Sequence, residues 1–294
     1  MRSIKEKDLY HPVQKVLTST VLDPAVAYTI TSDMRHVIIT HVKGEPKILT
    51  FVSDYYNLVK NEDVFPVLEK EFHYVFGDIE TRCVVDDHAR FFVDYILLDK
   101  GFKKEHDLVY PSVRISNSYD TGVPFAMSGN CFRVEGSTVV QVVDDTTRKP
   151  FYHKFKHTDR NDAKWFVART KEFLDQYEKM LIQIERLKRF EVHPSRIMLA
   201  FEVLKKGTEF PAKSFPRAHE IVLRQAKLLY GNSVNMYLIY HGLAYILNHD
   251  HGFKMKEHLR QKTATNLYNN ALDMISAKKA GAVAPLVSVP LSVV

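Results

Sequence analysis

The sequence predicts an α+β protein, with an antiparallel β-meander in the N-terminal half packed against a basic helical C-terminal half. Two changes along the chain support this. Hydrophobic residues alternate with polar ones in the first half, whereas in the second half they recur at helical spacing. The net charge changes too: residues 1–147 carry 16 basic and 22 acidic side chains, and residues 148–294 carry 25 and 13. We therefore expect an acidic strand-rich domain over 1–147, a basic helical domain over 148–279 and an apolar tail over 280–294.

The first strands are expected where β-branched residues alternate, before the turn at residues 43–46. A helix is expected to start at Ser53. Asn61 is expected to cap a second helix, because acidic residues follow it. Turns rich in Asp and Gly then separate the strands of the meander. The expected strands cover residues 28–31, 36–42, 48–52, 80–86, 90–98, 112–119, 124–134 and 138–143.

Beyond residue 158 a long amphipathic helix is expected, opened by Asp159 and ending near Phe190. Shorter helices follow, and a glycine stands between successive ones, as is typical just beyond helix C-termini. The expected ranges are 194–204, 216–230, 233–248 and 254–279, and the glycines are Gly207, Gly231 and Gly252.

A composition of 45% hydrophobic and 26% charged residues excludes the disordered, collagen-like and disulfide-scaffold classes. Cys83 and Cys131 are the only cysteines, and the charged N-terminal segment has no apolar run of the secretory type. No window of the sequence is long and apolar enough to span a membrane. These observations predict a cytoplasmic protein in a reducing compartment.

The basic half predicts an anionic partner, since a net charge of +12 attracts polyanions and steers their encounter. The alternative is that the acidic and basic halves neutralise each other within one molecule or an oligomer.

Common catalytic motifs are missing from the sequence: we find neither familiar phosphate-binding glycine loop, no Gly-x-Ser-x-Gly and no His-Glu-x-x-His. We expect a non-enzymatic protein without a cofactor.

His249-Asp250-His251, with His241 before it, could hold a divalent ion, but a polar helix terminus or a phosphate contact is favoured. Asp86-Asp87-His88 is favoured as a solvated turn. A metal-dependent nuclease is therefore the third alternative.

The most distinctive segment runs from Tyr110 to Gly122, followed by residues 128–133. Two adjacent strands would bring its polar side chains together, and such side chains contact phosphates and stack on bases. The candidates are Arg114, Asn117, Tyr119 and Arg133. Equally weighted is an Asx-type hairpin turn whose polar groups satisfy one another and the backbone.

Three motifs carry a resemblance to a known family. They are Val52-Ser-Asp-Tyr-Tyr-Asn-Leu-Val-Lys-Asn-Glu-Asp-Val-Phe, Arg114-Ile-Ser-Asn-Ser-Tyr-Asp-Thr-Gly and Phe132-Arg133. Over residues 25–250 the chain resembles a phage- and plasmid-encoded family that is described as a domain of unknown function. The chain departs from that pattern by an inserted Thr121 and by Val134-Glu-Gly where many members carry Cys-x-Asn-Gly. The resemblance implies a mobile-element protein, often encoded near replication, recombination or counter-defence functions.

Basic residues that stand at helix starts are a second candidate site, because positive charge there opposes the helix dipole. They are Lys213, Arg217, Arg224, Lys227, Lys254, Lys256, Arg260 and Lys262. Aromatic residues interleave with them, a composition typical of single-strand binding, although aromatic residues at helical spacing are more often core. These aromatic residues are Phe210, Phe215, Tyr230, Phe253 and Tyr268.

The sequence thus predicts a phage-type protein that binds nucleic acid, with single-stranded DNA favoured, in replication, recombination or transcription. The alternative is a counter-defence or regulatory protein that binds a host or phage protein. The apolar tail over 280–294 could add a strand to a neighbour, dock in a partner or support a homo-oligomer.

Overall fold

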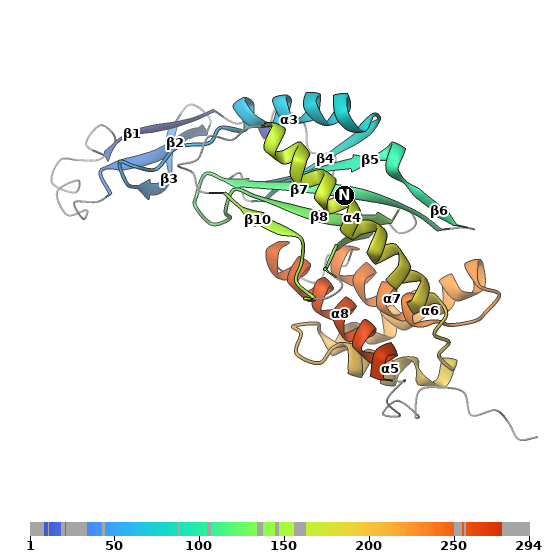
Figure 1. Ribbon diagram of the computed structural model, residues 1–294. Helices are drawn as coiled ribbons and strands as arrows, with labels where there is room; N and C mark the ends of the chain where they lie inside the picture. The colour runs from blue at the N-terminus through green and yellow to red at the C-terminus, as the bar shows by residue number, and fades with distance from the viewer. Residues whose placement is uncertain are drawn as a thin grey trace, which may run out of the picture. The chain divides into compact units, whose positions relative to one another are not determined.

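The computed structural model confirms the α+β class: antiparallel sheets lie in the N-terminal half and helices in the C-terminal half (Figure 1). The strand expected at 28–31, the start of the helix at Asp159 and the apolar tail lie outside the described residues. The structure describes residues 9–10, 12–18, 21, 34–42, 45–86, 89–104, 107–133, 138–144, 147–155, 163–249, 255 and 257–277.

The chain divides into two compact units and passes between them several times. The sequence predicts one boundary at residue 147, where charge and periodicity change, but two strands of the larger sheet continue from one unit into the other, so no single boundary separates them. The first unit contains Met1–Gly101, Pro111–Gly129 and Tyr152–Glu172, and the second contains Phe102–Tyr110, Asn130–Phe151 and Phe173–Val294.

Both sheets are antiparallel, and each expected strand within the described residues is present. The small sheet has the order β1-β2-β3, from Val13–Leu17, His36–Val42 and Glu45–Val52. The larger sheet has the order β10-β8-β7-β5-β4, with β6 paired to β7 and β9 to β8. Its strands are β4 (Ile79–Asp86), β5 (Arg90–Leu97), β6 (Phe102–Lys104), β7 (Asp107–Ser118), β8 (Ala126–Arg133), β9 (Thr138–Gln141) and β10 (Tyr152–Lys154).

Helix α3 (Asn61–Phe76) packs on β4 and β5 through its aromatic residues. The rings of Phe72 and Tyr95 meet edge to face at 4.9 Å, and the Tyr95 hydroxyl donates to the carbonyl of Phe65. The helix expected from Ser53 does not form, and Asn61 is the first helical residue rather than a side-chain cap.

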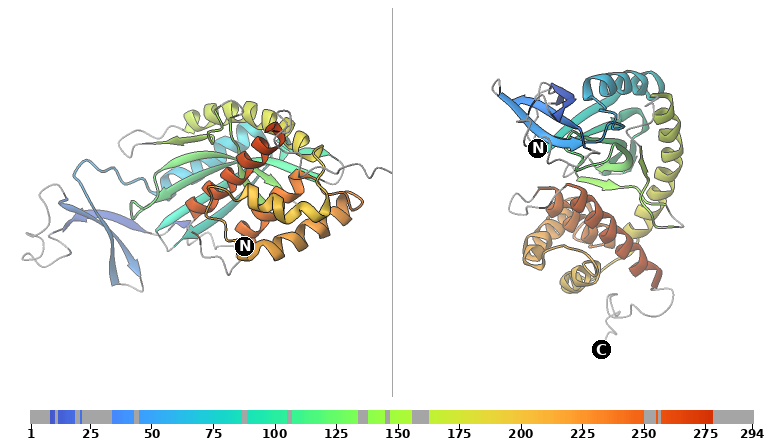
Figure 2. Two further views of the ribbon diagram at one scale, coloured as in Figure 1. Left: turned by 90° about the horizontal axis from the view of Figure 1, so that it is seen from below. Right: turned by 90° about the vertical axis from the view of Figure 1, so that its left-hand side faces the viewer.

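The helices of the C-terminal half begin with α4 (Ala163–Lys188). Four shorter helices follow within three residues of their expected ends, and Figure 2 shows them gathered in one cluster of the second unit. They are α5 (Ile197–Leu204), α6 (Phe215–Leu229), α7 (Met236–His249) and α8 (Glu257–Ala277). Gly207 and Gly231 follow α5 and α6 with φ of +69° and +57°, left-handed values that glycine adopts at little cost.

Helix α7 lies at the centre of this cluster and contacts α5, α6, α8 and β9. Eleven of its fourteen residues are buried, so it is apolar around almost its whole circumference. Within the part of the chain that the structure describes, none of the helices combines the length and the apolar character needed to cross a membrane.

Candidate functional site

Helices α6 and α7 approach each other closely at Gly242. A Cβ atom at this position would lie 2.6 Å from Cγ2 of Val222 and 3.1 Å from the carbonyl oxygen of Ala218. Both distances are shorter than a well-packed interior tolerates without movement. Glycine therefore lets the backbone of α7 lie against α6.

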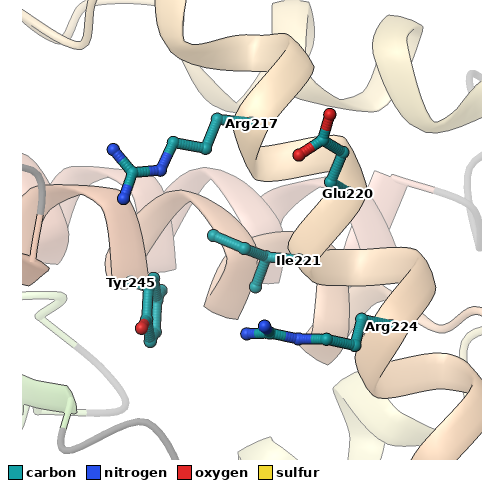
Figure 3. Close-up of a pocket in the computed structure, with 5 residues that line it drawn as sticks. All are labelled: Arg217, Glu220, Ile221, Arg224 and Tyr245. Carbon is teal, nitrogen blue, oxygen red and sulfur yellow. The ribbon is translucent and has the colours of Figure 1, made fainter.

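An open pocket of about 280 Å³ lies between the same two helices. Ile221 is buried, Tyr245 is half-buried, and the charged lining residues are exposed. In Figure 3 the side chains of Arg217 and Arg224 extend from α6 to the side on which Tyr245 of α7 lies. The five lining residues are Arg217, Glu220, Ile221, Arg224 and Tyr245.

Exposed cations continue along α6 beyond the pocket. Lys213, Arg217, Arg224 and Lys227 are spaced by four, seven and three residues, so they lie along one face of the helix and the turn before it. Glu220 stands in the same row. Among the described residues, Lys213, Arg224 and Lys227 have no acidic side chain within ion-pair distance. Their charges are therefore available to an anionic ligand.

A column of rings runs along α7 to the pocket. Tyr237, His241, Tyr245 and His249 are spaced by four residues, and successive ring centroids are 6.3, 6.5 and 4.4 Å apart. Burial lowers the pKa of His241 well below its ordinary value, and the positive charge of Arg133 and the neighbouring His249 lower it further. His241 is therefore neutral at pH 7.

Two arginines that the sequence predicts for a nucleic-acid surface are buried instead. Arg114 donates through Nε and Nη2 to the two carboxylate oxygens of Asp94, both at 2.6 Å. The guanidinium of Arg133 lies 5.3 Å from the ring centroid of Tyr237, and the residue is 2% exposed. Both guanidinium groups are buried beside these partners, so neither side chain is part of an exposed surface.

Asn117 and Tyr119 are buried as well. The Asn117 amide donates to the carbonyl of Val59 and to the side-chain oxygen of Asn61, each at 2.9 Å. The Tyr119 hydroxyl accepts a hydrogen bond from the backbone N–H of Asn61. These two residues hold the start of α3 and are not part of a nucleic-acid surface.

The loop after Tyr119 forms the Asx-type turn that was the alternative interpretation. Asp120 accepts a hydrogen bond from the N–H of Gly122 at 2.9 Å and pairs with Arg90 at 2.8 Å. Thr121, inserted relative to the family pattern, has φ of +58°, which is rare for a β-branched residue.

The remaining predicted residues divide between surface and core. Lys262 is exposed, and Arg260 is half-buried and donates to the carbonyl of Met255 at 3.3 Å. Lys254, Lys256 and Phe253 lie outside the described residues. Phe210 and Phe215 stack at 5.9 Å in the core, Tyr268 is buried and donates to Gln183, and Tyr230 is half-buried.

The two candidate metal clusters lie for the most part outside the described residues. In the described ranges, no three His, Cys, Asp or Glu side chains gather where they could hold a metal ion. Asp87, His88, Asp250 and His251 lie outside those ranges.

Sequence reasoning did not single out Glu220, Ile221, Gly242 or Tyr245. Two patterns in the sequence could have indicated Gly242 and Tyr245. Small residues, Ala218 and Gly242, stand on two successive helices, and rings recur every fourth residue along α7.

Comparisons of the chain with protein-family models, with curated proteins and with solved structures found no match.

Proposed function

We propose that the protein is a non-enzymatic nucleic-acid-binding protein that holds its ligand on the exposed face of α6. The observation that carries this proposal is the row of exposed cations, Lys213, Arg217, Arg224 and Lys227, beside a pocket that contains an aromatic ring. Cations placed along a surface attract the phosphates of a backbone, and binding then releases counterions.

Single-stranded DNA is the favoured ligand because the pocket contains Tyr245. Bases of a single strand are available to stack on aromatic side chains, whereas bases in a duplex already stack on one another. The family resemblance extends the proposal to a phage-type protein that acts in the host cytoplasm during replication, recombination or transcription.

The proposal is tested by fluorescence anisotropy with labelled mixed-sequence 20-mers, single- and double-stranded, across a salt series. We expect tighter binding of the single strand and an affinity that falls steeply with salt. The double substitution Arg224→Glu and Lys227→Glu should lower the affinity. It should also reduce the log–log salt slope by about 0.7 for each phosphate that the variant no longer neutralises.

Lys179→Glu is the matched control, because Lys179 is exposed on α4 and lies outside the proposed row. It should retain the salt slope of the wild type. The proposal would be overturned if no salt-sensitive binding were found at low ionic strength. It would also be overturned if the Lys179 variant lost as much affinity as the double variant.

Apolar side chains next to the cations favour a second candidate function, binding of a host or phage protein with a regulatory or counter-defence role. Leu223 and Leu228 of α6 are 40% and 66% exposed. An acidic amphipathic partner would suit such a surface, and the apolar tail would be a further anchor or a route to a homo-oligomer. Capture from infected extract separates the two candidates, because a protein-mediated contact survives added nuclease.

A further inference from the structure

We propose that the pocket between α6 and α7 binds a guanine base of the single strand. This inference rests on the proposed function and names the part of the ligand that the pocket recognises. The cations of α6 account for phosphate binding, but they do not account for Glu220, a carboxylate that stands in the same row and lines the pocket. A negative charge at this position weakens phosphate binding.

The carboxylate of Glu220 has a hydrogen-bonding role that suits one base better than the others. An ionised carboxylate only accepts hydrogen bonds, through two oxygens. The Watson–Crick edge of guanine carries two adjacent donors, N1–H and the N2 amino group, which match those two oxygens. Adenine and cytosine place an acceptor nitrogen beside their amino group, and thymine places carbonyls on both sides of its N–H. Only guanine satisfies both oxygens without repulsion.

Arg217 extends the match to the neighbouring edge of the base. It stands three residues before Glu220 on α6, so the two side chains lie side by side one turn apart. Guanine carries the acceptors O6 and N7 next to its two donors, and arginine is the residue that binds these acceptors best. Arg217 would thus donate to O6 and N7 of the guanine, while the neighbouring Glu220 would accept from N1–H and the N2 amino group.

The remaining walls of the pocket suit a base and its phosphate. Tyr245 offers an aromatic ring for stacking, and Ile221 supplies a buried apolar surface. Arg224, one turn beyond Glu220, provides a cation for the attached phosphate. The volume of about 280 Å³ is close to the lower end of small-ligand sites.

The test compares 15-mers of thymidine whose central residue is dG, deoxyinosine, dA, dC or dT, by fluorescence anisotropy at one salt concentration. We expect the oligonucleotide with dG to bind about tenfold more tightly than the one with dT. Deoxyinosine, which lacks the N2 amino group, should lie between them. Glu220→Gln should remove most of the preference, leaving only the part that comes from Arg217, and should leave the all-thymidine 15-mer bound at least as tightly, because the change removes a negative charge.

Glu209→Gln is the matched control, since Glu209 is exposed in the same unit and its removal changes the net charge equally. It should keep the preference for dG. Circular dichroism checks that both variants are folded. Equal affinity for all five 15-mers would overturn this inference alone, as would a preference of undiminished size in Glu220→Gln. Failure of every 15-mer to bind at low salt would overturn the proposed function as well.

Discussion

The backbone N–H of Asn61 donates a 2.9 Å hydrogen bond to the phenolic oxygen of Tyr119, 58 residues further along the chain. Asn61 is the first residue of α3, where backbone N–H groups have no partner within the helix. Burial raises the pKa of Tyr119 well above its ordinary value, so the phenol is neutral at physiological pH. A tyrosine that follows β7 therefore supplies the acceptor that a side-chain cap would supply elsewhere.

Tyr119→Phe should lower the free energy of unfolding by about 1–3 kcal/mol, because it leaves a buried N–H without an acceptor. Urea denaturation measures the change. Tyr74→Phe is the control: Tyr74 is 87% exposed, and its variant should match the wild type. The affinity for single-stranded DNA should not change in either variant. A Tyr119→Phe protein of wild-type stability that binds DNA more weakly would contradict the structural role.

Asp94→Ala should be more damaging, because it leaves the Arg114 guanidinium buried without its counter-ion. The expected loss is about 3–5 kcal/mol, measured by the same denaturation. Replacing both partners, with Arg114→Met and Asp94→Leu, should recover most of the loss. Glu80→Ala removes the partner of Arg82 in an exposed pair and should cost less than about 1 kcal/mol. Equal losses for Asp94 and Glu80 would contradict the burial of the pair.

The sequence predicts those properties that neighbouring residues along the chain determine, and it does not predict those that depend on distant residues. Strand and helix periods are local, so the ranges of β5 and α6 are predicted closely from the residues themselves. Burial of a polar side chain is not local: Asn117 and Tyr119 look like surface residues until Asn61 is placed beside them. The helix predicted from Ser53 is a further error of local patterns, because residues 53–60 form no helix.

The candidate site divides in the same way. Arg224 and Lys227 are exposed because α6 is amphipathic, and its polar face can be read from spacing. Tyr245 is missed because α7 is apolar around almost its whole circumference, so the hydrophobic pattern does not indicate which of its residues face a pocket, and the four-residue spacing of its rings is the only local signal.

Gly242→Ala should destabilise the protein by about 1–3 kcal/mol and weaken binding of single-stranded DNA, because the added methyl group pushes α6 and α7 apart beside the pocket. Val222→Ala removes the side-chain atom that lies 2.6 Å from the new Cβ. The double variant should therefore lose less stability than the sum of the two single variants. Strict additivity in thermal unfolding would contradict the close approach of the helices.

His241 should make stability depend on pH in the acidic range. Its pKa in the folded chain lies well below the value of about 6.5 expected for the unfolded chain. Below about pH 6.5 the unfolded chain therefore binds a proton that the folded chain does not. The contribution of His241 to the free energy of unfolding is therefore fully present above this pH. It is lost as the pH falls, by up to about 1.4 kcal/mol per pH unit.

His241→Phe should flatten this dependence when urea midpoints are compared at pH 7, 6 and 5. His219→Phe is the matched control for loss of a histidine, because His219 stands on α6 and is only half-buried, and its urea midpoints are measured at the same three pH values. An unchanged slope in the His241 variant would show that other groups bind the proton.

Tyr245→Leu separates stacking from charge at the proposed site. Loss of one base–aromatic stack should weaken binding of single-stranded DNA by about 1–3 kcal/mol, while Tyr245→Phe keeps the ring and should bind like the wild type. Because neither change removes a cation, the salt slope should stay at the wild-type value, in contrast to the Arg224 and Lys227 variant. Titrations at two salt concentrations distinguish these effects. If the leucine variant binds as tightly as the phenylalanine variant, the pocket does not stack a base, and the cations of α6 alone hold the strand.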